Sequence, residues 1–175
     1  MLFSTITLAS LVGLAASVDM SRYAADLGVE SEFKDYLEEL YVSAEDPSAT
    51  TGFTNFFTID GQLLVLGNTA TGADEIQALK QELLPFSGEK HWNHFPNTTK
   101  VDSETSAQKT YQVLGVIETK FDGGNCSQAY YSTRFILTKD GSGSPQFITH
   151  AGNLVAYNDY IVDPPHTPTD IACGT

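Results

Sequence analysis

Four segments rich in β-branched and aromatic residues fill the second half of the chain and limit its fold more than any other feature. Short turn-forming clusters, DSET, DGGNCS and DGSGS, separate them. The segments read KHWNHFPNTTKV (90–101), SAQKTYQVLGVIETKF (106–121), QAYYSTRFILTKD (128–140) and PQFITHAGNLVAY (145–157). Because loops this short join antiparallel neighbours, the segments are predicted to form a four-strand antiparallel meander.

Two amphipathic helices are predicted in the first half of the chain. Residues 31–44 place apolar side chains one helical turn apart and stop before Pro47, and residues 71–86 do the same and stop at Pro85. The short aromatic segment 49–60 lies between them, and its last residue begins a predicted Asp-Gly turn that leads into a buried strand, QLLVLG. Helices followed by a meander predict an α+β domain whose helices cover one face of a curved antiparallel sheet.

The two ends of the chain differ from this domain. The first seventeen residues, MLFSTITLASLVGLAAS, carry no charged side chain and are predicted to be a secretory signal peptide; a buried N-terminal helix is the alternative. The chain then divides into the signal peptide (1–17), a single domain (18–160) and an extended, proline-rich tail (161–175). No second long apolar run follows the first, so the processed chain is expected to be soluble, secreted and extracellular.

Cysteines and sequons agree with export. Cys126 and Cys173 are the only cysteines, and in an oxidising compartment they are expected to form one disulfide that pins the tail; two free thiols are the alternative. The triplets N-T-T at Asn97 and N-C-S at Asn125 are glycosylation sequons. The sequence therefore predicts a secreted glycoprotein with one disulfide.

The net charge and the absence of known motifs exclude several classes of partner and site. Acidic residues outnumber basic ones by 22 to 9, which gives a net charge of −13 that repels nucleic acids and anionic membranes. His91 and His94 fall on opposite faces of a strand and have no helical or cysteine partners, so no metal site is expected. Neither a Gly-x-Ser-x-Gly elbow nor a glycine-rich phosphate loop is present. Neither nucleic acid nor membrane is expected as a partner, and no cofactor is expected.

Two stretches resemble a known superfamily. FFTIDGQLLVLGNTATGADEI (56–76) resembles an acid-Gly turn, a strand and a Gly-initiated helix, and HFPNTTKV (94–101) resembles a His-apolar-x-Asn strand. Both are similar to the nuclear transport factor 2-like superfamily, which includes SnoaL-like polyketide cyclases, scytalone dehydratase and ketosteroid isomerase. The resemblance covers about Phe33 to Tyr157. It implies a cone-shaped fold with a cavity for a small molecule, and a homodimer formed by the outer face of the sheet.

The resemblance assigns a role to His94. In scytalone dehydratase-like members the matching histidine faces the cavity and pairs with an aspartate near the end of the first helix. Here Tyr41 matches a cavity tyrosine, and Val42 stands where the aspartate would be. Three nearby carboxylates are candidates to replace it, and no spacing rule selects among them: Glu39, Glu45 and Asp46.

The period of the strand itself gives an independent orientation. In regular β geometry His94 and Trp92 share one face, while His91 and Asn97 share the other. A glycosylated Asn97 must face solvent, so Trp92 and His94 are predicted to point inward unless Pro96 introduces a bulge.

The candidate site is assembled from inward positions on these elements. The residues expected to take part in chemistry are His94, Tyr41 and Tyr111. The residues expected to contact a ligand are Trp92, His150, Phe57, Val113 and Phe135. The competing interpretation is that the aromatic residues are core and that the inward histidine is hydrogen-bonded scaffolding.

Two functions follow from this site. The first is a secreted protein whose apolar cavity binds a small aromatic or polyketide-like molecule. The alternative is a cofactor-free lyase or isomerase, of dehydratase or cyclase type, with His94 as general acid/base and the two tyrosines orienting a carbonyl group or water. A carboxylate within hydrogen-bond reach of His94 would favour the enzyme. A third alternative is a cone filled by its own side chains, with the outer face forming a dimer.

Overall fold

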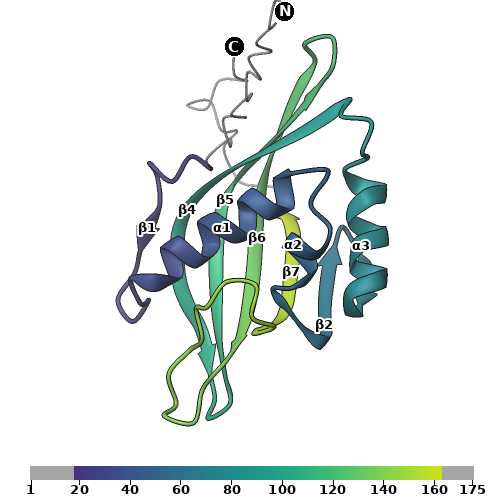
Figure 1. Ribbon diagram of the computed structural model, residues 1–175. Helices are drawn as coiled ribbons and strands as arrows, with labels where there is room; N and C mark the ends of the chain where they lie inside the picture. Colours follow the sequence, from purple (N-terminus) through teal and green to yellow (C-terminus); the bar gives the residue numbers. More distant parts are fainter. Residues whose placement is uncertain (1–17, 163–175) are drawn as a thin grey trace, which may run out of the picture.

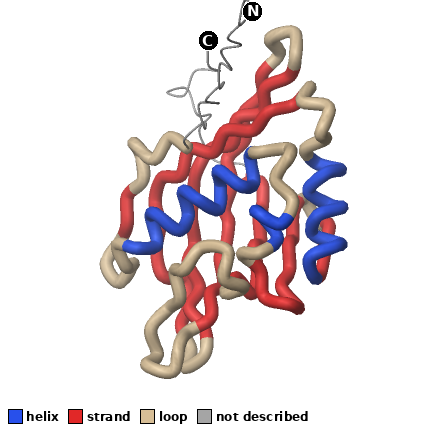
Figure 2. Tube along the Cα trace, in the orientation of Figure 1, coloured by secondary structure: helices blue, strands red, loops and turns tan. Residues whose placement is uncertain are grey.

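A curved, unclosed sheet with helices on its concave side makes up the fold (Figures 1 and 2). The computed structural model describes residues 18–162; the predicted signal peptide, Cys173 and residues 163–175 of the predicted tail lie outside the described residues. Seven strands form one sheet in the order β1-β4-β5-β6-β7-β2-β3. The strands are β1 (Ala24–Ala25), β2 (Phe57–Val65), β3 (Asn68–Thr71), β4 (Lys90–Glu104), β5 (Gln108–Phe121), β6 (Cys126–Thr138) and β7 (Leu154–Val162). The helices are α1 (Glu32–Glu45), α2 (Thr51–Thr54) and α3 (Gly72–Leu83).

The predicted meander is confirmed, because β4, β5, β6 and β7 pair in sequence as antiparallel neighbours. The predicted α+β class is confirmed with it. Three pairings were not predicted: β1 pairs with β4 and β2 with β7 as parallel strands, and β2 pairs with β3 as antiparallel neighbours. Among residues 18–162, no helix is both long and apolar enough to cross a bilayer.

The last strand begins later than predicted. The sequence predicted a strand over 145–157, but β7 starts at Leu154, and residues 146–153 form a loop. The Asn153 side chain fixes this loop, since its Nδ2 donates to the Ile148 carbonyl at 2.7 Å and its Oδ1 accepts from the Tyr36 hydroxyl at 2.8 Å. His150 has a left-handed backbone with φ 57°, which no regular strand allows. The prediction that His150 lies on a strand face is therefore wrong.

The predicted Asp60-Gly61 turn is also corrected. Strand β2 runs through both residues, and its pairing with β7 becomes irregular between Phe57 and Gln62. The chain instead reverses at Leu66 and Gly67, which both have positive φ and join β2 to β3. At Gly61 an added Cβ would lie 2.8 Å from the Phe57 Cβ, so the glycine serves a close packing contact within the irregular strand.

Helix α1 lies across the concave face of the sheet, as Figure 1 shows. Its buried face contains apolar side chains at the helical spacing predicted for residues 31–44: Phe33, Tyr36, Leu37, Leu40 and Tyr41. The Phe33 ring stacks on the Tyr111 ring of β5 with centroids 4.1 Å apart. The helix ends at Glu45, so its last residue lies over the sheet next to β4.

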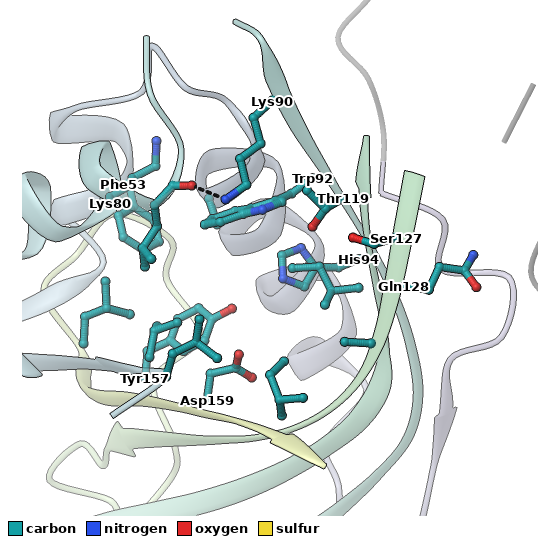
Figure 3. A pocket seen from close by; sticks show the side chains of 18 residues that line it. Phe53, Lys80, Lys90, Trp92, His94, Thr119, Ser127, Gln128, Tyr157 and Asp159 are labelled. Atoms are coloured by element: carbon teal, nitrogen blue, oxygen red, sulfur yellow. Dashed lines mark hydrogen bonds between the residues drawn. The ribbon is translucent and has the colours of Figure 1, made fainter. Parts of the chain in front are cut away.

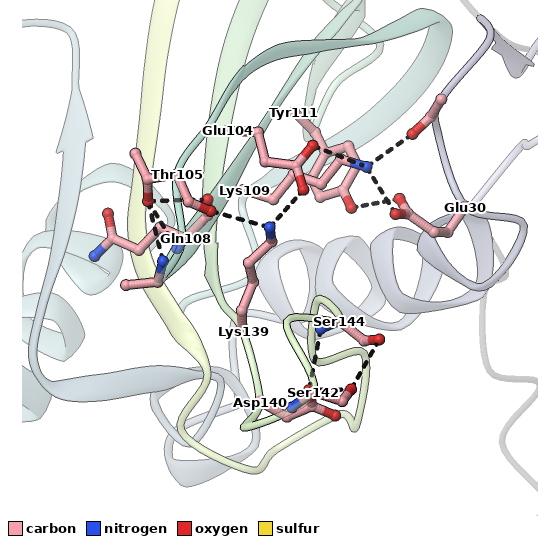
Figure 4. Close-up of polar contacts among 12 residues, drawn as sticks. Glu30, Glu104, Thr105, Gln108, Lys109, Tyr111, Lys139, Asp140, Ser142 and Ser144 are labelled. Atoms are coloured by element: carbon pink, nitrogen blue, oxygen red, sulfur yellow. Dashed lines mark hydrogen bonds and ion pairs between the residues drawn. The ribbon is translucent and has the colours of Figure 1, made fainter.

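A buried polar network joins the beginning of α1 to one end of the sheet (Figure 4). The Lys109 ammonium donates to Glu30 Oε1 at 2.7 Å and to the Gly28 carbonyl at 2.9 Å, and the Tyr111 hydroxyl donates to Glu30 Oε2 at 2.6 Å. Burial of the Glu30 carboxyl would raise its pKa, but these hydrogen bonds outweigh burial and hold the pKa below its usual range. Tyr111, a predicted site residue, is therefore committed to this structural network.

Candidate active site

A central cavity of about 200 Å³ lies between the helices and the concave face of the sheet. It is lined by residues of α1, α2 and α3 on one side and of β2, β4, β5, β6 and β7 on the other. Its apolar wall consists of Ala44, Phe53, Leu63, Val65, Leu66, Leu83, Ile117, Ala129 and Ile161. Figure 3 shows a smaller polar set among the aromatic side chains, including His94, Tyr157 and Asp159. An apolar cavity with a few convergent polar groups is the usual composition of a small-molecule site.

His94 and Glu45 form a buried dyad at the cavity wall. Glu45 Oε1 accepts from His94 Nδ1 at 2.9 Å and from the His94 backbone N–H at 2.5 Å. The two side chains are only 6% and 11% exposed. Because an ionised carboxylate can only accept, Nδ1 carries a proton and the neutral ring keeps its lone pair on Nε2. Among the three candidate carboxylates, the structure selects Glu45.

Two buried tyrosines support the imidazole from behind. The Tyr41 ring stacks on the His94 ring with centroids 4.1 Å apart and an interplanar angle of 7°. Its hydroxyl donates to the Tyr131 hydroxyl at 3.1 Å. Burial raises the pKa of both tyrosines, so both stay protonated near neutrality. Tyr41 therefore fixes the plane of the ring rather than lining the central cavity.

Asp159 is a site residue that the sequence analysis missed. It lines the central cavity from β7, next to Tyr157, and accepts a hydrogen bond from the Thr133 hydroxyl. Burial raises the pKa of the Asp159 carboxyl, against the lowering effects of Thr133 and the nearby His94. The sequence contained a signal for this position, because Asp159 follows Tyr157 by two residues and so shares its strand face. It was lost because the predicted strand ended at Tyr157.

Replacing Asp159 with asparagine is expected to stabilise the fold at pH 7 by about 1 kcal/mol. A carboxyl whose pKa is raised by folding adds stability below its unfolded pKa, and this contribution is lost as the pH rises through the folded value. Urea unfolding at pH 7 and at pH 4 would measure this, and the advantage of Asp159→Asn should shrink at pH 4. The exposed Asp60→Asn is the control and should change little at either pH. Equal stability of Asp159→Asn and wild type at both pH values would contradict the expectation.

The other predicted residues fall into two groups. Trp92 lines the central cavity beside His94, while His91 lies on the opposite face, where its side chain is 53% exposed and 3.8 Å from Asp122. The predicted inward and outward histidines are thus found as expected. The remaining predicted residues do not line this cavity: Tyr111, Val113 and Phe135 are fully buried, Phe57 borders a separate pocket, and His150 lies in the exposed loop before β7.

The residues predicted to be modified lie at the surface or outside the described part. Asn97 and Asn125 are exposed, and Cys126 begins β6. Glycosylation and the pairing of Cys126 with Cys173 stay predictions. Within residues 18–162, no group of three or more His, Cys, Asp or Glu side chains is arranged to hold a metal ion.

Comparison with known proteins shows similarity in structure only. No protein-family model and no curated protein sequence matches the chain. Among solved structures, ActVI-ORFA from Streptomyces coelicolor aligns with a TM-score of 0.57 at 12% identity, over 74% of this chain and 94% of that one. A ketosteroid isomerase-like protein from Erwinia carotovora aligns with a TM-score of 0.52 at 16% identity, over 75% and 94% of the two chains.

A third solved structure has a bound ligand in its name. The Orange Carotenoid Protein of Anabaena, binding canthaxanthin, aligns with a TM-score of 0.52 at 18% identity, over 87% of this chain and 43% of that protein. At these identities the likeness concerns the fold. The described chain therefore has the cone-shaped fold of the nuclear transport factor 2-like superfamily, as its sequence predicted.

Proposed function

We propose that the protein is a cofactor-free general acid/base catalyst, a lyase or isomerase, that acts on a small apolar molecule with a carbonyl group. The observation that carries this proposal is the Glu45–His94 dyad at the wall of an apolar cavity. A histidine in this tautomer can accept a proton at Nε2, and the carboxylate behind it stabilises the imidazolium that forms.

The proposed step begins with transfer of a proton from a carbon next to the carbonyl group to His94 Nε2. The C–H electron pair moves into the new double bond of an enolate, and the Asp159 carboxyl, whose pKa burial raises, donates a hydrogen bond to the oxygen that gains charge. An isomerase would return the proton from His94 to another carbon. In a dehydratase the enolate would re-form its carbonyl group while a new C=C bond forms to the β-carbon and the β-hydroxyl group leaves with the C–O electron pair. That group takes the Asp159 proton and departs as water, and His94 then loses its proton to solvent as Asp159 regains one.

Binding without turnover is the second candidate function. The mostly apolar wall of the central cavity favours it, and the solved structures of similar fold include a carotenoid-binding protein as well as an isomerase-like one. The two candidates differ in whether Nε2 of His94 removes a proton from the bound molecule.

A generic carbon acid distinguishes them. 5-Nitrobenzisoxazole is a small aromatic molecule whose C–H proton is removed by a base as its N–O bond breaks, which gives a coloured cyanophenolate. Trp92 is the only tryptophan and lines the central cavity, so quenching of its emission reports entry of the probe. Quenching with turnover above the buffer rate supports the catalyst. Quenching without turnover supports a binding protein. If the probe causes neither quenching nor turnover, the idea of a ligand cavity is refuted.

The location, glycosylation and oligomeric state of the protein are proposals as well. We propose that the protein is secreted and glycosylated at Asn97 and Asn125, on the basis of its apolar leader and two sequons. Pairing of two copies through the outer sheet face stays a prediction, which light scattering would test.

A further inference from the structure

Two lysines line the central cavity, although the chain has only nine basic residues against 22 acidic ones. The other lysines that are not fully exposed each have a carboxylate within 4 Å: Lys109 with Glu30, Lys120 with Glu118 and Lys139 with Glu104. Among the described residues, neither Lys80 nor Lys90 has such a partner. An ammonium group turned toward an apolar wall without a counterion is costly, so each of these two lysines calls for a physical reason.

Lys80 has a structural reason. Its ammonium donates to the backbone carbonyls of Asp46 at 2.6 Å and Ala49 at 3.2 Å. These carbonyls belong to the loop that directly follows Glu45. Lys80 therefore holds the end of α1, and with it the carboxylate of the dyad, against α3.

Lys90 makes fewer hydrogen bonds to the described residues than Lys80 does. Its ammonium donates to one carbonyl, that of Leu83 at 2.7 Å, and lies 5.2 Å from the centre of the Trp92 ring (Figure 3). An ammonium has three N–H donors, so the single described bond leaves two for another acceptor. Burial lowers the pKa of Lys90, which indicates that its charge is poorly solvated and would gain from an anionic partner.

Two hydroxyl groups lie beside Trp92 in one row of paired residues across the sheet. Trp92 of β4 pairs with Thr119 of β5, which pairs with Ser127 of β6, and all three line the central cavity. This end of the cavity thus combines an aromatic face, an ammonium and two hydroxyl donors, which are the groups that bind a carboxylate or phenolate on a ring.

The opposite end of the cavity holds the proposed chemistry. His94 follows Trp92 by two residues on the same face of β4. Its row across the sheet is therefore about 7 Å along the strand from the row of Trp92. One aromatic ring is long enough to reach from one row to the other.

We infer that the central cavity takes an aromatic molecule with an anionic oxygen substituent, held by Lys90 and the hydroxyls of Thr119 and Ser127, with its ring against Trp92. This inference extends the acid/base site proposed above and rests on it for the position of the reacting carbon, about one ring length from the anion.

Binding of two matched probes tests the inference without turnover. 2-Naphthoate and 2-naphthamide have the same ring and nearly the same shape, and only the first carries a charge. Calorimetry at low salt is expected to show naphthoate binding about tenfold more tightly than naphthamide, since a single partly buried ion pair is worth about that ratio. Lys90→Gln should bring the ratio close to one and leave the naphthamide affinity within about twofold.

Three controls separate charge recognition from folding. Lys90→Arg keeps the charge and should keep most of the preference. Lys100→Gln removes an exposed lysine from the same strand and should keep all of it. Thermal unfolding of each variant verifies the fold. Equal affinity of both probes in the wild type, or a preference that survives in Lys90→Gln, would overturn the inference. Turnover of 5-nitrobenzisoxazole, a neutral probe, is independent of this result and would still support the acid/base proposal.

Discussion

Replacing His94 with glutamine is expected to lower turnover of 5-nitrobenzisoxazole by about 10²- to 10⁴-fold. Glutamine can still donate to Glu45, but it has no lone-pair nitrogen that can accept a proton. Quenching of Trp92 by the probe should change little, because the apolar wall of the central cavity stays in place. Stopped-flow absorbance would give the rate, and titration of the tryptophan emission would give the affinity.

Glu45→Gln tests how the carboxylate acts. A glutamine amide can donate to His94 Nδ1, which favours the tautomer with the proton on Nε2 and removes the base, so a loss of about 10²-fold or more is expected without loss of binding. His91→Gln is the matched control, since it changes the same residue type on the exposed face of the same strand. If His94→Gln and His91→Gln retain equal turnover, His94 is scaffolding and the acid/base proposal fails.

The sequence predicted the parts of the fold that depend on local patterns. Short turn clusters determined the order β4-β5-β6-β7, and the helical spacing of apolar residues identified the buried face of α1. The alternation along β4 correctly placed Trp92 and His94 inward. These features depend on side-chain period and loop length, which can be read within a few residues of the sequence.

The errors arose where distant contacts decide the local structure. The loop before β7 is held by the Asn153 side chain and the hydroxyl of Tyr36, 117 positions away, so the aromatic stretch at 145–153 did not form the strand that its composition suggested. Because the predicted strand ended at Tyr157, whereas β7 runs from Leu154 to Val162, Asp159 was not assigned to a strand face. The same shift in the bounds of the strand also misplaced His150.

The sequence limited the partner of His94 to three carboxylates but could not choose among them. The resemblance places Val42 where scytalone dehydratase-like proteins have an aspartate, and three carboxylates stand three or four residues from it: Glu39, Glu45 and Asp46. Residues three or four apart lie on the same face of a helix, so this spacing admits all three carboxylates and selects none of them. In the structure Glu45 is the carboxylate that accepts hydrogen bonds from His94. Glu39 instead lies near His150, with 3.4 Å between Oε1 and Nε2.

Replacing Gly115 with alanine is expected to destabilise the fold by about 3 kcal/mol, because overpacking of a rigid core displaces its neighbours. An added Cβ would lie 2.6 Å from the Phe95 carbonyl oxygen and 2.5 Å from Cζ of Tyr131, and it would also overlap the Tyr131 hydroxyl. Neither neighbour can yield easily: one is backbone of the paired strand β4, and the other is 1% exposed and bonded to Tyr41. Urea unfolding would measure the loss.

The effect of Gly115→Ala should extend to the site. Tyr131 accepts from Tyr41, and Tyr41 stacks on His94, so displacement of Tyr131 is expected to tilt the imidazole and reduce turnover in the variant molecules that still fold. Gly141→Ala is the matched control, because nothing lies within 4 Å of its added Cβ and its stability should stay within about 0.5 kcal/mol of the wild type. If Gly115→Ala matched that control in both stability and turnover, the tight stack from β5 through the two tyrosines to His94 would be disproved, and the orientation of the base would have to come from Glu45 alone.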